Sequence, residues 1–424
     1  MSGDVEAEDG NGVPDVCSTQ EDSAPAKRRR ATRRGGAEKR ARSLRLTNTE
    51  LREALDPMVE MRREHPSAVA GLIASGVRPL APLGTQLMGR YKLRRLIGRG
   101  AFGQIYACDD ALSANRVVAA KLEPTSRDHR RIQLELCVLL ELSGVQAERA
   151  AVDKTSVNHA PFVFGSGVDR EAGVNFIVME RLSRNLSDLR KRRSSHCFSA
   201  NTVVKVLGQA LDALERLHDS GWIHRDVKPS NMCVGLSSRT RMRTIILVDY
   251  GMVRRWRKVN AEGGSDTPEQ MVAERPRGSV GFRGTPRYAS SSALSRADQH
   301  RADDLISLFY SAVELLIARL PWYRTRDQKK ILEAKRRIPV DQLLGKLQSG
   351  PPTDCLLCWA AELSRVRFSQ QPPYQRLRSA LHKALNAQNM QANFYFDWEL
   401  DFMEEKAARI AAASTDNSSQ PDIQ

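Results

Sequence analysis

The sequence predicts an α+β fold with two lobes, a small lobe rich in β-strands followed by a larger lobe that is mainly helical. Three observations predict it. Short runs typical of strands dominate residues 91–179. A glycine-rich turn joins the first two of these runs. From residue 203 onward, apolar residues recur at helical spacing.

The small lobe is predicted to hold a sheet and one helix. The helix follows from Ile132, Leu136 and Leu139, which recur at intervals of four and three residues. The strands are expected at residues 91–97, 104–109, 116–122, 162–166 and 175–179.

The larger lobe is predicted to contain a buried central helix. Residues 305–317 are apolar nearly all round, as expected for a helix surrounded by others. Another helix has one apolar stripe, which is formed by Val203, Leu207, Ala210, Leu214 and Leu217. Between these helices, strands at 232–234 and 244–248 are predicted to form a hairpin.

The change in composition along the chain predicts the domain boundaries, with the folded domain at residues 86–402. Residues 1–44 are too polar to bury a core, so we expect them to be disordered, and residues 48–63 are predicted to form a short helix. The tail with its linker, the small lobe, the larger lobe and a C-terminal tail are placed at residues 1–85, 86–180, 181–402 and 403–424.

The composition argues against several classes of protein. No run of about eighteen apolar residues is present, which argues against a membrane span. The first 22 residues are rich in acids and lack an apolar run, which excludes an ordinary secretory signal. The seven cysteines are scattered without CxxC pairs, which argues against a disulfide framework or a zinc site. We therefore expect reduced thiols in a cytoplasmic or nuclear protein, and we expect a monomer.

The net charge of +16 predicts an anionic partner, such as nucleic acid, a membrane surface, microtubules, or acidic and phosphorylated substrates. Charge alone does not choose among these. The densest basic run is Lys27–Arg34. Two interpretations of this run stay open, a patch for nuclear import or polyanion binding and a solvated tail.

The glycine-rich turn is Gly98-Arg99-Gly100-Ala101-Phe102-Gly103. Glycines let a backbone approach phosphate groups and present its N–H groups to them. A GxGxxG run alone is weak evidence, and in a dinucleotide-binding domain it would lie between a strand and a helix. Here the chain continues as a strand, so the turn belongs to a β-hairpin. This context favours a loop that covers the phosphates of a nucleotide.

A lysine and a glutamate of the small lobe are predicted to meet. Lys121 lies near the end of an apolar strand, where a buried ammonium group is costly unless it is paired. Glu135 lies beside the inward stripe of the following helix, so it can reach Lys121. Such a pair would hold the lysine ready for nucleotide phosphates. A structural salt bridge or an exposed lysine is the alternative.

The strongest signal is His224-Arg225-Asp226-Val227-Lys228-Pro229-Ser230-Asn231, which matches the pattern H-R-D-x-x-x-x-N. In phosphoryl transfer, Asp226 fits the group that accepts a hydroxyl proton, and Lys228 supplies positive charge. The Asn231 amide fits a metal ligand. The predicted hairpin would place Asn231 beside Asp249, a second metal ligand.

Taken in order, these motifs resemble the protein kinase superfamily. Residues 284–290 read Gly-Thr-Pro-Arg-Tyr-Ala-Ser and resemble the motif G-T-x-R-Y-A-S of the casein kinase 1 group. Residues 184–189 resemble the tau-tubulin kinase branch of that group. Three further short motifs typical of the group match residues 303–305, 320–322 and 396–398. The resemblance covers about three quarters of the chain and leaves out the first 85 residues.

The resemblance implies a bilobal protein kinase fold, with ATP and Mg²⁺ as cofactors. Met179 would stand beside the adenine, Glu180 to Leu182 would bond it through their backbone, and Cys233 would lie beneath it. Thr285 would orient Asp226 and Lys228. The full set of implied nucleotide contacts is Ile97, Gly98, Gly100, Phe102, Gly103, Ile105, Ala119, Lys121, Glu135, Met179, Glu180, Leu182, Cys233 and Val248.

The resemblance also bears on Asp304 and His218. Asp304, on the central helix, would anchor the loop of residues 224–231 (the catalytic loop). His218 matches no such role, and we interpret it as a hydrogen-bonded histidine at a helix end.

The resemblance also implies a preference for acidic or phosphorylated protein substrates, because enzymes of the casein kinase 1 group use basic residues near the motif that residues 284–290 match to bind them. Arg287 matches such a position, and Arg283 is predicted to contact the substrate with it. Arg277 and Lys329 are further candidates. Solvated surface arginines are the alternative.

The sequence departs from the kinase pattern in two places. Tyr250 stands where kinases usually carry phenylalanine, and its hydroxyl needs a partner. The segment between Gly251 and Gly284 is longer than usual and includes the loop 261–266. Both departures leave catalysis possible, but they bear on the conformation of this segment.

The sequence therefore predicts a kinase that phosphorylates serine or threonine in proteins. A kinase-fold scaffold without activity is the main alternative, although Lys121, Asp226 and Asp249 are all present. A protein that binds nucleic acid through its basic tail is a second alternative, which no aromatic-interleaved basic platform supports.

Overall fold

The structure is a computed structural model. The parts of the chain that it describes are residues 78–100, 102–113, 117–126, 130–153, 156–236, 238–256, 280–368, 370–387 and 395–417. The described residues up to Lys406 belong to one compact unit of the chain. Several predictions lie outside the described residues, namely those for the basic run Lys27–Arg34, the helix at 48–63, Ala101, the loop 261–266 and Arg277.

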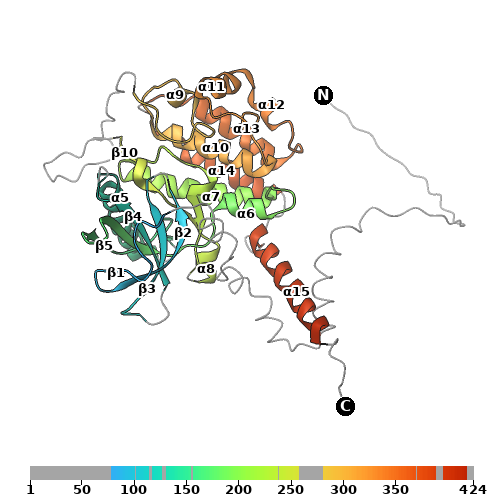
Figure 1. Ribbon diagram of the computed structural model, residues 1–424. Helices are drawn as coiled ribbons and strands as arrows, with labels where there is room; N and C mark the ends of the chain where they lie inside the picture. The colour runs from blue at the N-terminus through green and yellow to red at the C-terminus, as the bar shows by residue number, and fades with distance from the viewer. Residues whose placement is uncertain are drawn as a thin grey trace, which may run out of the picture. The chain divides into compact units, whose positions relative to one another are not determined.

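The small lobe is a six-stranded antiparallel sheet with one helix packed on it (Figure 1). The strand order is β1-β2-β3-β4-β6-β5. The predicted strands and helix are present, each within a few residues of its expected bounds. The elements are β1 (Gln86–Leu87), β2 (Tyr91–Arg99), β3 (Gln104–Asp110), β4 (Val117–Pro124), α5 (Arg130–Val152), β5 (Val163–Asp169) and β6 (Val174–Glu180).

Residues just before the predicted domain boundary at residue 86 contact the sheet of the small lobe. Ala81 is buried in the core of the small lobe. The backbone N–H of Leu80 donates to Gln104 Oε1 at 2.9 Å and to the Tyr106 hydroxyl at 3.0 Å. The end of the predicted linker therefore packs against the sheet, because two polar side chains of β3 bind its backbone.

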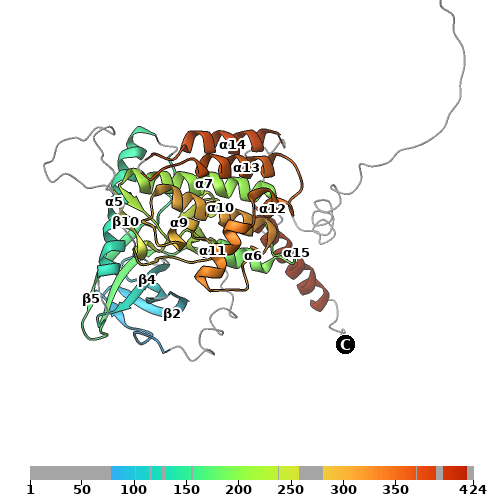
Figure 2. The ribbon, with the colours of Figure 1, turned by 90° about the horizontal axis from the view of Figure 1, so that it is seen from above.

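The larger lobe is mainly helical, as predicted, and Figure 2 shows α7, α10, α13 and α14 packed as layers. Its helices are α6 (Leu186–Arg192), α7 (Ala200–Asp219), α8 (Arg239–Met242), α9 (Ser291–Leu294), α10 (Arg301–Ile317), α11 (Gln328–Arg337), α12 (Val340–Leu344), α13 (Pro351–Ser364), α14 (Tyr374–Ala387) and α15 (Asp397–Asn417). Its short strands and 3₁₀ turns are β7 (Trp222–Ile223), η1 (Pro229–Asn231), β8 (Met232–Val234), β9 (Ile245–Leu247), η2 (Tyr250–Met252) and β10 (Arg254–Arg255).

Helices α7 and α10 form the centre of the larger lobe. The apolar stripe predicted on α7 is buried along its whole length, and Ser199 caps the helix by accepting a hydrogen bond from the Thr202 N–H. Helix α10 is buried on nearly all sides, as its composition predicts. Between α7 and α10 in sequence, the predicted hairpin is present as the pair β8 and β9.

The C-terminal boundary predicted at residue 402 falls inside α15. The ion pair between Arg193 and Asp401 measures 2.7 Å, and that between Arg192 and Glu405 measures 2.5 Å. Helix α15 therefore contacts the larger lobe beyond the predicted boundary. In the described parts of the chain, no helix has both the length and the apolar character that a membrane crossing requires.

Candidate active site

The glycine-rich turn is the tip of the β2–β3 hairpin, as predicted. Arg99 pairs with Gln104 across the hairpin, and the Gly100 N–H donates to the Gly103 carbonyl at 2.9 Å. A Cβ atom on Gly103 would lie only 2.2 Å from the Leu122 carbonyl oxygen, so this position requires glycine. Because the backbone at Gly103 lies so close to the backbone at Leu122 in β4, this glycine of the motif is needed even without a bound phosphate.

Lys121 lies at the centre of a buried charge cluster. Its Nζ is 2.5 Å from Glu135 Oε2, which is the predicted contact, and 3.1 Å from Asp249 Oδ1. Burial alone would lower the pKa of Lys121, but the charges and hydrogen bonds of Glu135 and Asp249 raise it above its ordinary value. Burial would raise the pKa of Asp249, but Lys121 holds it below its ordinary value. Lys121 and Asp249 therefore both stay charged.

Side chains from two segments contact the carboxylate of Asp226, which is buried. Lys228 Nζ lies 2.6 Å from Asp226 Oδ2, and the Thr285 hydroxyl donates to Asp226 Oδ1 at 2.7 Å. Lys228 also donates to the Thr285 hydroxyl at 3.0 Å. These contacts fix the orientation of the carboxylate, as the predicted role of Thr285 requires.

The hairpin of β8 and β9 brings Asn231 to Asp249, as the sequence analysis expects. The Val248 N–H donates to the Asn231 carbonyl at 2.9 Å, and Asp249 is the next residue. The Asn231 amide nitrogen donates to the Asp226 carbonyl at 2.9 Å, which leaves the amide oxygen available. An amide oxygen and a partly exposed carboxylate are oxygen donors of the kind that Mg²⁺ prefers, so these residues fit the metal.

The catalytic loop is anchored to α10 by Asp304. Its carboxylate accepts the backbone N–H groups of His224 at 2.6 Å and Arg225 at 2.8 Å. His218 Nε2 lies 3.0 Å from the same carboxylate, and His218 Nδ1 lies 2.6 Å from the Tyr374 hydroxyl. Burial raises the pKa of Asp304, but the contact with His218 and nearby donors hold it below its ordinary value. His218 is a hydrogen-bonded residue near a helix end, as predicted, and it also supports this anchor.

The backbone at the site adopts uncommon conformations. Arg225 and Asp249 both have φ of 68°, in the left-handed region. Gly284 has φ of 106°, and a Cβ atom there would lie 2.3 Å from the Arg225 carbonyl oxygen. Gly284 thus lets the 284–290 segment pass directly against the catalytic loop. Such strain is characteristic of functional sites.

A family model of the protein kinase domain matches residues 91–383. The chain belongs to the protein kinase family. It is 31% identical over 319 residues to a probable serine/threonine-protein kinase of Dictyostelium discoideum, in an alignment that covers 75% of this chain and 58% of that protein. It is 35% identical over 256 residues to a putative casein kinase I of Caenorhabditis elegans, with coverage of 60% and 67%. The chain thus spans little more than half the length of the Dictyostelium relative.

The tyrosine in place of the usual kinase phenylalanine has a hydrogen-bond partner. Tyr250 is buried, and its hydroxyl donates to the Leu247 carbonyl at 3.0 Å. Its ring centroid lies 5.4 Å from that of His224, so the ring still packs against the catalytic loop. The substitution therefore leaves the arrangement of the kinase site intact.

Replacing Tyr250 by phenylalanine is expected to lower stability slightly and to leave the kinase site assembled. The change removes one neutral buried hydrogen bond, which contributes about 1 kcal/mol. Thermal unfolding of the two proteins measures the difference. A loss of several kcal/mol would show that the hydroxyl has a further role.

Several residues predicted to contact the nucleotide lie on strands β2, β3, β4 and β6 of the small lobe, and Cys233 lies on β8 of the larger lobe. Ala119 pairs with Met179 across β4 and β6, and Cys233 forms a bridge with Asn185. The other predicted residues of this set are partly exposed, as a ligand surface requires, and they are Ile97, Ile105, Leu182 and Val248.

Glu180 has a role that the sequence analysis did not predict. Its carboxylate is buried and accepts hydrogen bonds from Arg241 at 2.9 and 2.6 Å. Arg241 comes from α8 of the larger lobe. The ion pair therefore holds the end of β6 against the β8–β9 hairpin. The sequence carried no signal for it, because the two residues are 61 positions apart.

The described start of the segment between Gly251 and Gly284 is tied to α5, to β7 and to the loop that precedes α10. Arg255 lies 2.6 Å from Glu141 of α5, and its guanidinium stacks 4.2 Å from the Trp222 ring. The indole N–H of Trp222 donates to the same glutamate at 2.6 Å. Arg254 lies 3.2 Å from Asp298.

The two arginines predicted to contact the substrate differ in their surroundings. Arg287 Nη1 lies 3.3 Å from Glu314 Oε1, and Nη2 donates to the Tyr323 carbonyl at 3.1 Å. Its side chain is still 38% exposed. Arg283 is exposed, as is Lys329 at the start of α11. Arg287 is thus a fixed, half-exposed cation rather than a freely moving surface arginine.

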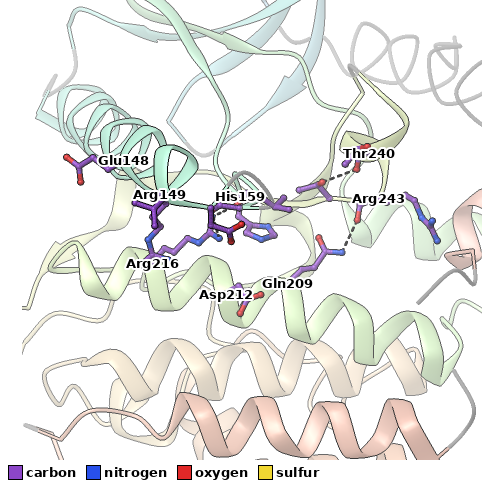
Figure 3. A pocket seen from close by; sticks show the side chains of 13 residues that line it. Glu148, Arg149, His159, Gln209, Asp212, Arg216, Thr240 and Arg243 are labelled. Atoms are coloured by element: carbon purple, nitrogen blue, oxygen red, sulfur yellow. Dashed lines mark hydrogen bonds between the residues drawn. The ribbon is translucent and has the colours of Figure 1, made fainter. Parts of the chain in front are cut away.

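A pocket of about 1090 Å³ lies between the end of α5, α7 and the segment around α8 (Figure 3). His159 lies near its middle, with Arg149 and Arg216 on one side. His159 Nδ1 bonds to the Ile245 carbonyl at 2.7 Å, and burial lowers the pKa of this histidine to about 4. None of the predicted site residues lines the pocket, so it is separate from the kinase site.

Proposed function

We propose that this protein is a serine/threonine kinase that transfers the γ-phosphate of Mg·ATP to hydroxyl groups of proteins. One observation carries the proposal. Lys121 contacts Asp249, and Asn231 links the segment of Asp249 to Asp226, so a phosphate-binding cation, the metal-binding groups and the candidate base form one continuous site. The family relationship and the two relatives support the same activity.

In the proposed in-line phosphoryl transfer, the residues of the site have different roles. Lys121, held by Glu135, would bind the α- and β-phosphates of ATP. Asn231 and Asp249 would hold Mg²⁺, which supplies positive charge against the phosphate oxygens when bound. The substrate oxygen forms a bond to the γ-phosphorus while the bond to the β–γ bridging oxygen breaks and ADP leaves. The hydroxyl proton passes to Asp226, and Lys228 offsets the charge that develops.

Transfer of labelled γ-phosphate to an acidic protein such as casein tests the proposal. Purified wild-type protein with Mg·ATP is expected to label casein on serine or threonine, and the Asp226→Asn variant is expected to give almost no label. The scaffold alternative predicts that neither protein labels the substrate. Label in both at equal rates would point to a contaminating kinase and would contradict the proposal.

We further infer that the substrates are acidic or already phosphorylated, as in the casein kinase 1 group and its tau-tubulin kinase branch. Arg287 lies two residues after Thr285 in the 284–290 segment, and 38% of its side chain is exposed. Arg283, which directly precedes this segment, is also exposed. Guanidinium groups bind phosphate and carboxylate through paired hydrogen bonds, which suits this task.

Replacing Arg287 by alanine is expected to lower kcat/KM for a phosphorylated peptide about tenfold more than for the unphosphorylated peptide. The unphosphorylated peptide is also expected to lose some activity, because buried Glu314 loses one of its partners. The ratio of the two kcat/KM values is therefore the measurement. Arg170→Ala, an exposed change of the same charge in the small lobe, is the control. Equal losses on both peptides would remove the inference.

A further inference from the structure

Lys335 is a buried lysine for which the described part of the chain offers no acidic partner. It lies on α11, and 8% of its surface is exposed. Among the residues that the structure describes, it forms no ion pair, and burial lowers its pKa well below the ordinary value. A buried ammonium group without an anion is costly, and a leucine or methionine would fit an apolar site more cheaply. The presence of lysine therefore needs a reason in the contacts of its Nζ.

Those contacts are backbone oxygens and aromatic rings. Lys335 Nζ donates to the Ala289 carbonyl and, at 3.3 Å, to the Pro286 carbonyl. It lies 4.2 Å from the centroid of the Tyr310 ring and 5.1 Å from that of the Trp322 ring. Carbonyl oxygens and aromatic faces both carry partial negative charge, so together they replace part of the lost hydration.

Both carbonyls belong to the segment that orients Asp226. Pro286 follows Thr285, whose hydroxyl bonds to Asp226 and Lys228. The carbonyl between them in the chain, that of Arg287, accepts a hydrogen bond from the Trp322 indole N–H at 2.8 Å. Helix α11 also packs against α9, which begins directly after this segment. Lys335 and Trp322 thus hold the backbone carbonyls of this segment through three hydrogen bonds.

We propose that Lys335 is a positioning residue for the protein substrate, which acts by holding the carbonyls of Pro286 and Ala289 and thereby the placement of Thr285. This inference rests on the proposed kinase activity and adds to it. Lys335 is buried under the segment, so it is not expected to touch either substrate or nucleotide. Its effect should appear in the peptide reaction and be absent from nucleotide binding.

The kinetic test compares Lys335→Met with wild type. Methionine keeps most of the side-chain length and removes the charge and the donors. We expect kcat/KM for an acidic peptide to fall about tenfold while KM for ATP stays unchanged. Arg337→Met, an exposed change of the same charge on the same helix, is expected to change neither value. The proposal would be overturned if kcat/KM for the peptide did not fall, or if KM for ATP rose about as much as the peptide kcat/KM fell.

A double-mutant cycle tests the route of the effect. If Lys335 acts through Thr285, adding Lys335→Met to Thr285→Ala should lower peptide kcat/KM little further. Losses that multiply would show that the two residues act separately. If Lys335→Met does not fold, Trp322→Phe removes the donor to the Arg287 carbonyl and keeps an aromatic side chain at this position. It is expected to lower peptide kcat/KM in the same way, and an unchanged value would contradict the proposed positioning.

Amide hydrogen exchange separates this inference from the proposed activity. Exchange in the peptide that contains residues 285–290 should be faster in Lys335→Met than in wild type, because the segment loses its anchor. If wild type proved unable to phosphorylate any peptide, the proposed activity would fail. The exchange result would still decide whether Lys335 holds the segment, and equal exchange in the two proteins would show that it does not.

Discussion

Replacing Asp226 by asparagine is expected to lower phosphoryl transfer about a thousandfold, because the amide cannot accept the substrate proton. The side chains of aspartate and asparagine have nearly the same shape, so the variant is expected to fold as wild type does. Lys228 and Thr285 both contact the wild-type carboxylate, so the change also removes the negative charge that holds them. The loss should therefore appear mainly in kcat, and nucleotide binding should persist.

Single-turnover rates with labelled ATP and calorimetric titration with Mg·ATP measure these two quantities separately. Asp341→Asn is the matched control, because Asp341 is exposed on α12 and far in sequence from the catalytic loop. Residual activity near that of the control would show that another group accepts the proton. Loss of Mg·ATP binding along with activity would mean that the variant disturbs the whole site.

The central residues of the site could be predicted from the sequence because local spacing determines their contacts. Asp226, Lys228 and Asn231 lie in one loop, and the β8–β9 hairpin after it carries Asp249 back to it. The meeting of Lys121 with Glu135 followed from helical spacing, because the helix begins soon after the strand. In each case a short stretch of regular structure fixes the geometry.

Contacts between distant segments could not be predicted in this way. Nothing in the spacing pairs Glu180 with Arg241, or places Lys335 under the carbonyls of Pro286 and Ala289. A lysine among the charged residues of α11 is typical of a solvated side chain, and only packing against Tyr310 shows that it is buried.

Contacts near the two predicted domain boundaries could not be predicted from the sequence for a related reason. Composition marks where apolar residues become sparse, whereas the folded domain ends where its last contacts are made. The backbone of Leu80 is bound by side chains of β3. At the other end, α15 makes ion pairs through Asp401 and Glu405, which a hydrophobic pattern does not detect.

Replacing Asp249 by asparagine is expected to weaken Mg·ATP binding and to lower phosphoryl transfer by about two to three orders of magnitude. The amide has similar shape and keeps an oxygen donor, but it lacks the charge that favours a divalent cation. Because Lys121 holds the pKa of Asp249 below its ordinary value, the wild-type carboxylate is ionised at neutral pH, so the variant loses a full charge. Lys121 keeps Glu135 as its partner.

The dependence of nucleotide affinity on Mg²⁺ isolates this effect. Wild type should bind ATP more tightly with Mg²⁺ than with a chelator present, whereas Asp249→Asn should show a much smaller difference. Its affinity without metal should be equal to or higher than that of wild type, because the triphosphate no longer meets the carboxylate charge. An undiminished Mg²⁺ effect in the variant would mean that Asp249 is not a metal ligand, and that its contact with Lys121 serves only to place the lysine.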